Sequence, residues 1–204
     1  MTTQIAASLA GNESLHRLVE NGASQRAIKA HLDGLAPYSR LQEVLGVTGS
    51  LVGKLYDAVA GAPALTPLDL VPPGETGVVI LEGRNSLPAF TRFQKRFARV
   101  DGKVIGYNHQ TMSFATGPGY FVVQPPTPGE SHPDELFFDY TVDPPHTGHP
   151  AGWPPFVSNS NGLSRLVYMH MKDFCRHVAE GVLVVKAYKH GVSQNAYFTL
   201  TRPY

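Results

Sequence analysis

Positive charge is concentrated in one short segment of this 204-residue chain. Residues 84–103 contain six Arg and Lys residues and a single acid, Asp101, whereas the whole chain carries a formal charge of only +1. Cations that lie close together raise the local potential and attract phosphate or carboxylate groups. We therefore take Arg84, Arg92 and Arg96 as candidate contacts to an anionic ligand.

The apolar residues of the same segment recur at helical spacing, which predicts a helix over residues 87–100. A step of about 100° per residue gives this helix an aromatic face and a basic face, the latter formed by Arg92, Lys95, Arg96 and Arg99. Pro88 suits the first turn. The alternative is that the basic face only solvates an amphipathic helix and binds nothing.

Polar and aromatic residues alternate with glycines over residues 106–120, where we expect a strand, a turn and a second strand. Aromatic rings provide apolar contact, and Asn and His side chains provide orienting hydrogen bonds, as in many ligand pockets. The candidate pocket residues are Tyr107, Asn108, His109 and Tyr120. An ordinary hairpin with its polar side chains in water is the alternative.

The histidines and the single cysteine limit the possible metal chemistry. His170, Asp173 and His177 would share one side of a helix predicted after Gly162, but an i to i+7 separation of about 10 Å is wide for one ion. We expect no metal site and no cofactor, and we place His170 among the ligand contacts as a half-buried residue bonded to a neighbour. The lone Cys175 excludes an internal disulfide and is expected to be buried.

No common nucleophile, phosphate-loop or zinc-protease motif occurs in the chain, so its catalytic residues are unassigned. Residues 41–55 look like a helix-turn-helix, with Gly46 ending the first helix. Lys54 is the only cation of the second helix, and residues 1–61 sum to zero charge. Because DNA affinity depends on neutralised phosphates, a DNA-binding regulator with a C-terminal ligand-sensing domain is the second hypothesis.

The elements that must position these residues fall into three parts. Residues 1–61 read as a helical region, residues 62–76 as a proline-rich linker, and residues 77–204 as an α+β domain, together one compact unit. Ten of the 17 prolines lie between residues 118 and 155, which predicts surface loops there. The predicted fold is α+β: the helical region packs on a mainly antiparallel sheet, and one long helix over residues 163–178 precedes a final β-hairpin.

The amino-acid composition limits which class of protein this is and which partners it can bind. Low net charge with 10% aromatic residues excludes a disordered chain. No apolar stretch has membrane-spanning length and the N-terminus lacks a signal pattern, so we expect a soluble, cytoplasmic protein without a membrane partner. We predict binding of a small organic ligand, and an anion would suit the basic segment. Nucleic acid is not the expected partner, and the sequence gives no oligomeric state.

Overall fold

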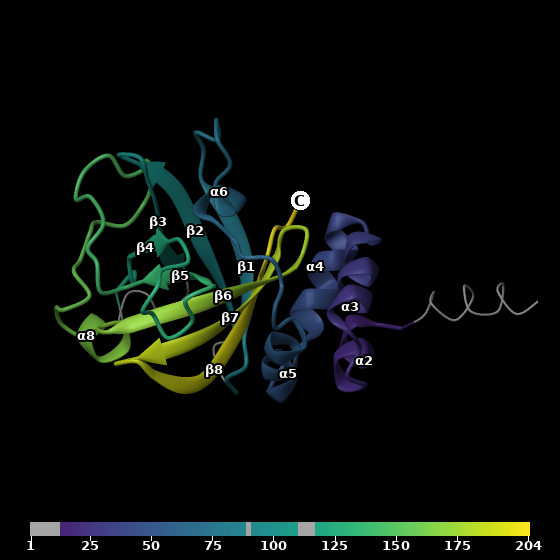
Figure 1. The fold of residues 1–204 in the computed structure, drawn as a ribbon. Coiled ribbons are helices and arrows are strands. Elements are labelled where there is room, and N and C mark those ends of the chain that lie inside the picture. The colour runs from purple at the N-terminus through teal and green to yellow at the C-terminus, as the bar shows by residue number, and fades with distance from the viewer. Residues whose placement is uncertain (1–12, 89–90, 110–116) are drawn as a thin grey trace, which may run out of the picture.

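The protein is a closed barrel of eight antiparallel strands with a layer of helices on one side, as the computed structural model shows for residues 13–88, 91–109 and 117–204 (Figure 1). Each strand pairs with the next in the chain, and β1 pairs with β8 to close the barrel. The strands are β1 (Val79–Asn85), β2 (Arg92–Val100), β3 (Lys103–His109), β4 (Phe121–Gln124), β5 (Leu136–Asp139), β6 (Met171–Ala179), β7 (Val182–Lys189) and β8 (Val192–Thr201).

The barrel interior is packed with side chains, many of them aromatic. Inward-facing residues alternate with outward-facing ones along each strand. Phe97, Phe121 and Phe138 form the centre of this core, with ring centroids 4.9–5.6 Å apart. Aromatic side chains therefore fill the centre of the barrel.

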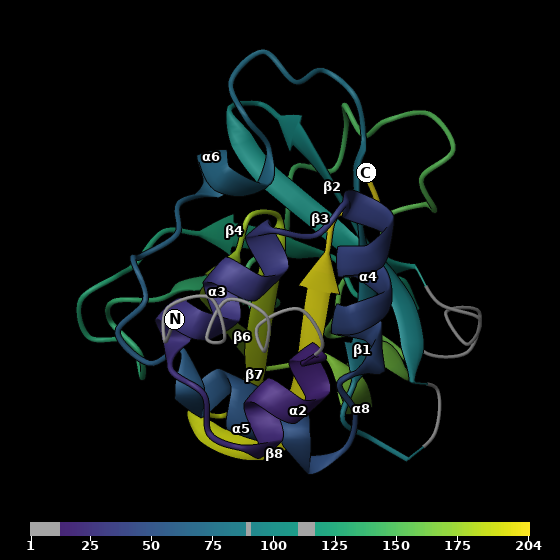
Figure 2. The same ribbon diagram turned by 90° about the vertical axis from the view of Figure 1, so that its right-hand side faces the viewer.

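Four helices cover the outer face of strands β6 to β8 (Figure 2). They are α2 (Leu15–Glu20), α3 (Gln25–Asp33), α4 (Pro37–Gly46) and α5 (Ser50–Ala58). Ser14 and Ser24 cap the first two by accepting backbone hydrogen bonds. Their apolar faces bury Val178, Val182 and Val184 of the barrel. None of the helices in the described ranges is long and apolar enough to cross a membrane.

The predicted α+β arrangement is wrong, because the sheet closes on itself into a barrel and the C-terminal half contains no long helix within the residues described. The other two helices within the described residues, α6 (Pro67–Leu70) and α8 (Ser164–Val167), are each a single turn. An open sheet and a closed barrel of antiparallel strands share the same local sequence patterns. Closure depends on the pairing of β1 with β8, more than 110 residues apart, as in Glu82 opposite Thr201.

The basic helix predicted over residues 87–100 is wrong: residues 92–100 form strand β2. A period of two places Phe93, Lys95 and Phe97 on the inner face of the barrel. Arg92 and Arg96 fall on the outer face. Because a lysine stands between the two phenylalanines, the alternation of apolar and polar residues that signals a strand is absent.

The long helix predicted over residues 163–178 is also wrong, since α8 covers one turn and residues 171–179 form strand β6. Both faces of this strand are buried. Phe174 packs outward against Phe137, and Cys175 faces the barrel core with 1% of its surface exposed. A strand buried on both faces shows no clean alternation, which explains the misassignment. The predicted burial of Cys175 is confirmed.

The predicted C-terminal hairpin is confirmed as β7 and β8, joined by a turn in which His190 and Gly191 both have positive φ. Val185 belongs to the barrel core, whereas Val184 belongs to the core beneath the helices. Strand β7 is therefore covered on both faces.

Candidate functional site

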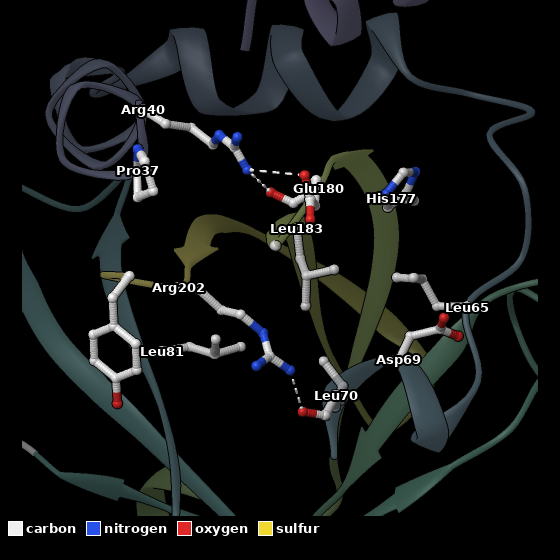
Figure 3. A pocket seen from close by; sticks show the side chains of 12 residues that line it. Pro37, Arg40, Leu65, Asp69, Leu70, Leu81, His177, Glu180, Leu183 and Arg202 are labelled. Atoms are coloured by element: carbon white, nitrogen blue, oxygen red, sulfur yellow. Dashed lines mark hydrogen bonds and ion pairs between the residues drawn. The ribbon is translucent and has the colours of Figure 1, made fainter. Parts of the chain in front are cut away.

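A pocket of about 510 Å³ lies at one end of the barrel, next to the helical layer (Figure 3). Helix α4, helix α6, the turn between β6 and β7, and the residues that follow β8 form its walls. Its chemically distinctive lining residues are Arg40, Leu65, Asp69, Leu70, Leu81, His177, Leu183 and Arg202.

The inner wall of the pocket is apolar. Leu65, Leu70, Leu81 and Leu183 all line it, and each of them is also part of the barrel core with at most 6% of its surface exposed. These leucines give the pocket a dry surface against which an apolar ligand group can be buried.

Arg202 is the cation placed among these leucines (Figure 3). Its backbone N–H donates to Gly181 O at 2.9 Å, and its Nη2 donates to Leu70 O at 2.8 Å, so both ends of the residue are held. Within the described residues, no carboxylate lies within ion-pair distance of its guanidinium.

The other charged groups of the pocket are largely engaged with the protein itself. Arg40 donates to the carbonyl oxygens of Leu32, Leu35 and Glu180, at 2.7–3.3 Å. Asp69 accepts two hydrogen bonds from Thr66 at the start of α6. Burial lowers the pKa of His177, and the charge of Lys29 lowers it further. Among the described residues, Arg202 is therefore the lining cation whose other guanidinium donors have no protein acceptor.

No family model, curated protein or solved structure matches this chain.

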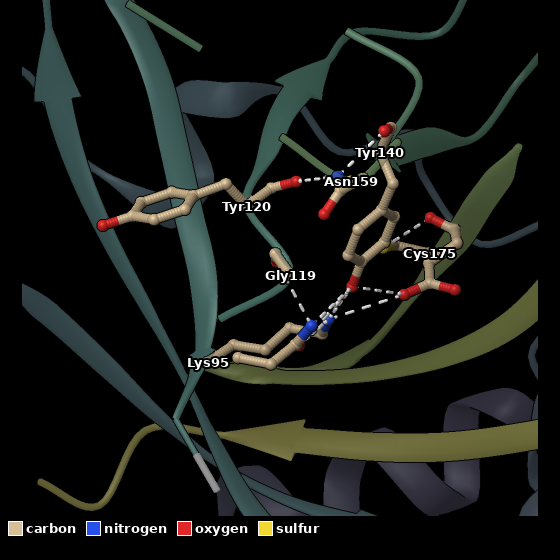
Figure 4. Close-up of polar contacts among 8 residues, drawn as sticks. Lys95, Gly119, Tyr120, Tyr140, Asn159 and Cys175 are labelled. Carbon is tan, nitrogen blue, oxygen red and sulfur yellow. Dashed lines mark hydrogen bonds and ion pairs between the residues drawn. The ribbon is translucent and has the colours of Figure 1, made fainter. Parts of the chain in front are cut away.

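A second polar site lies inside the barrel (Figure 4). The Lys95 Nζ donates to Asn108 Oδ1 at 2.7 Å and to the Tyr140 hydroxyl, and lies 3.5 Å from Asp173 Oδ2. The Tyr140 hydroxyl in turn donates to Asp173 Oδ2 at 3.0 Å. We call Lys95, Asn108, Tyr140 and Asp173 the interior cluster. Its four members come from β2, β3, the end of β5 and β6.

The interior cluster is held out of water. Lys95 is 2% exposed and Asp173 is 1% exposed. Burial lowers the pKa of the Lys95 ammonium and raises the pKa of the Asp173 carboxyl, because each charged form loses its hydration. Both shifts are toward the neutral form of the group, and the mutual attraction of Lys95 and Asp173 opposes them. Burial and the nearby Asp173 also raise the pKa of Tyr140.

The sequence-predicted site residues do not form one site. Arg84 donates to Leu45 O beneath α4, Arg92 lies directly opposite Arg84 on the neighbouring strand, and Arg96 donates to Gln94. His170 is exposed rather than half-buried, and its ring lies at a 36° tilt to that of His190, with ring centroids 4.3 Å apart. Neither the three arginines nor His170 lines the pocket of Arg202.

The predicted polar–aromatic pair of strands divides between the two faces of the barrel wall. Tyr107 packs on Tyr120, Trp153 and His109 on the outer face. Burial and Arg96 lower the pKa of His109. Asn108 alone points inward, where it joins Lys95. Among the described residues, no group of three or more His, Cys, Asp or Glu is placed to hold a metal ion.

The sequence did not identify Arg202, Tyr140 or Asp173 as ligand contacts, and it predicted that Lys95 lies on the basic face of a helix. The sequence did contain a signal for Lys95. If residues 93–97 are taken as a strand, Lys95 lies on the same face as the core residues Phe93 and Phe97. No local sequence pattern marks Arg202, because the other residues of its pocket come from α6 and the β6–β7 turn, which are distant from Arg202 or separated from it by a strand.

Proposed function

We propose that this protein binds a small organic acid in the pocket at the end of the barrel. The carboxylate of the ligand pairs with the guanidinium of Arg202, and its apolar part rests on Leu81 and Leu183. The observation that carries the proposal is an arginine fixed among buried leucines without a carboxylate partner in the described structure.

The dimensions and chemistry of the pocket support this assignment. A volume of about 510 Å³ lies within the range of small-molecule sites. Arginine offers a planar pair of donors that matches a carboxylate, and a partly apolar surrounding strengthens the interaction. The proposed ligand is still an anion, but the residue proposed to bind it is Arg202 instead of the arginines of residues 84–103. A cytoplasmic location, in keeping with the single cysteine, is part of the proposal.

The packing of α5 does not favour the DNA-binding hypothesis. This helix would be the recognition helix, yet its Val52, Leu55 and Tyr56 are buried, and a Cβ at Gly53 would lie 3.3 Å from Tyr197 of the barrel. Lys54 is the only cation on its exposed side. We therefore do not propose a DNA-binding function.

Isothermal titration calorimetry with a matched pair of probes tests the proposal. The probes are 2-naphthoate and 2-naphthamide, which share the same ring system and differ in charge. We expect 2-naphthoate to bind, and 2-naphthamide to bind at least about tenfold more weakly, because only the acid forms the charge-assisted pair with Arg202.

The Arg202→Gln variant should lose at least about tenfold in 2-naphthoate affinity while remaining folded. The control is Arg92→Gln, which removes an exposed arginine on the outer face and should leave the affinity unchanged. Equal affinity for the two probes, or an unchanged affinity in Arg202→Gln, would contradict the proposal.

A further inference from the structure

The interior cluster places the amine of Lys95 among aromatic rings. Besides its hydrogen bonds, the Lys95 Nζ lies 4.7–5.2 Å from the ring centroids of four aromatic residues, Phe121, Phe138, Tyr140 and Phe198. The Oδ1 atom of Asp173 is buried and has no hydrogen-bond partner in the described structure. An unpaired buried carboxyl oxygen is costly and is therefore uncommon without a functional reason.

We propose that Lys95 is a nucleophilic amine that forms an imine with a small apolar aldehyde or ketone inside the barrel, with Tyr140 and Asp173 moving the protons. This proposal goes beyond binding of an organic acid. It does not depend on the preference of the pocket of Arg202 for carboxylates.

The hydrogen bonds of the interior cluster provide a path by which Lys95 can become a neutral amine. The Lys95 ammonium can pass a proton through the Tyr140 hydroxyl to Asp173 Oδ2, since the three groups are connected in that order. The transfer leaves a neutral amine and a neutral carboxylic acid. The lowered pKa of Lys95 and the raised pKa of Asp173 both favour this form.

The covalent step balances within the cluster. The nitrogen lone pair of Lys95 attacks the carbonyl carbon, a C–N bond forms, and the carbonyl π electrons move to oxygen. One proton moves from the nitrogen to that oxygen through Tyr140, which gives a carbinolamine. The Asp173 acid then protonates the hydroxyl group, which leaves as water while the C=N bond forms. The products are an iminium ion, the Asp173 carboxylate and one molecule of water.

The surroundings favour the product charge. The iminium ion is a cation, and the aromatic faces around the nitrogen attract cations. The Asp173 carboxylate formed in the last step is its counter-ion. Asn108 Oδ1, which accepts from Nζ, can keep the nitrogen oriented while the carbon substituents change.

Reductive trapping followed by peptide mapping tests the proposal. The folded protein is incubated with cyclopentanone and cyanoborohydride at neutral pH, the hydride reduces the iminium to a stable secondary amine, and mass spectrometry gives the rate at each lysine. Lys186 is an internal comparison. It also lies near aromatic rings, on the outside of the barrel, but neighbouring hydroxyl groups raise its pKa despite partial burial.

We expect Lys95 to be modified at least about tenfold faster than Lys186, because a neutral amine beside an acid reacts as a nucleophile and an ammonium does not. Asp173→Asn keeps the size of the side chain and removes the acid, so it should slow modification of Lys95 about tenfold and leave Lys186 unchanged. The proposal would be overturned if Lys95 in the folded parent were modified no faster than Lys186. This comparison needs only the parent protein, so it holds even if Asp173→Asn does not fold. An unchanged Lys95 rate in folded Asp173→Asn would also overturn it.

The two proposals fail separately. If Lys95 is not trapped, the imine proposal fails and the proposed binding of 2-naphthoate is unaffected. If 2-naphthoate and 2-naphthamide bind equally, the organic-acid proposal fails and imine formation at Lys95 is unaffected.

Discussion

Leu81 of β1 and Lys95 of β2 lie directly opposite each other, so that their side chains share the inner face of the barrel. Leu81 also lines the pocket of Arg202. Leu81 therefore belongs to both surroundings, since it lines the pocket and lies opposite the buried amine.

Shortening this leucine should open the way to the amine. We expect Leu81→Ala to raise the rate of cyclopentanone trapping at Lys95 about tenfold, at a stability cost of about 2–5 kcal/mol for the cavity. Per-lysine rates from peptide mapping provide the measurement. The matched control is Leu32→Ala, a buried leucine of the helical layer with a comparable stability cost. If both variants raised the trapping rate at Lys95 equally, the cause would be general destabilisation of the fold. That result would contradict a route past Leu81.

The pH dependence of stability should report on His177 in the pocket wall. Burial lowers the pKa of this imidazole below its ordinary value of 6.5, so between the two values the unfolded chain binds more protons than the folded protein. The free energy of unfolding should therefore fall as the pH decreases through this window. Urea titrations at about pH 7.5 and about pH 5.5 should show a smaller fall in His177→Gln than in the parent. A residual fall is expected from His109 and His132, whose pKa values burial also lowers. The same fall in both proteins would contradict the assignment.

A charge placed in the barrel core should be poorly tolerated. Val185 has no exposed surface, so Val185→Asp should cost about 3–5 kcal/mol as a buried unpaired carboxylate. Val192→Asp, at a position 64% exposed, is the control and should change the free energy of unfolding by less than about 0.5 kcal/mol. Chemical denaturation measures both. A small effect at Val185 would show that the barrel interior admits water.

The contact between Tyr56 and Glu135 should hold the helical layer on the barrel. The Tyr56 hydroxyl donates to Glu135 Oε2 at 2.6 Å, while Arg176 binds Glu135 Oε1 and lies on the Tyr56 ring. Tyr56→Phe leaves one buried acceptor unpaired and should cost about 1–3 kcal/mol in denaturant titrations. Tyr38→Phe, at a position 71% exposed, should be neutral. Equal stability of the two variants would show that this contact does not anchor the layer.

The sequence predicts the parts of the fold that depend on local patterns. The four N-terminal helices have clear apolar periodicity with serine, proline and glycine at their ends, and all four form. The final hairpin has β-branched strands and a turn with a glycine, and it forms as well.

Strands β2 and β6 could not be predicted in this way, because Lys95 in one and the double burial of Phe174 and Cys175 in the other remove the alternation that identifies a strand. Barrel closure and the pocket of Arg202 depend on contacts between distant segments. Local periodicity carries no information about such contacts.

A crystal structure of the protein with 2-naphthoate tests the central claim most directly. We predict that the carboxylate lies within hydrogen-bond distance of the Arg202 guanidinium, with the naphthyl rings on Leu81 and Leu183. A ligand bound elsewhere on the protein, or bound in the pocket with its carboxylate turned away from Arg202, would contradict the account.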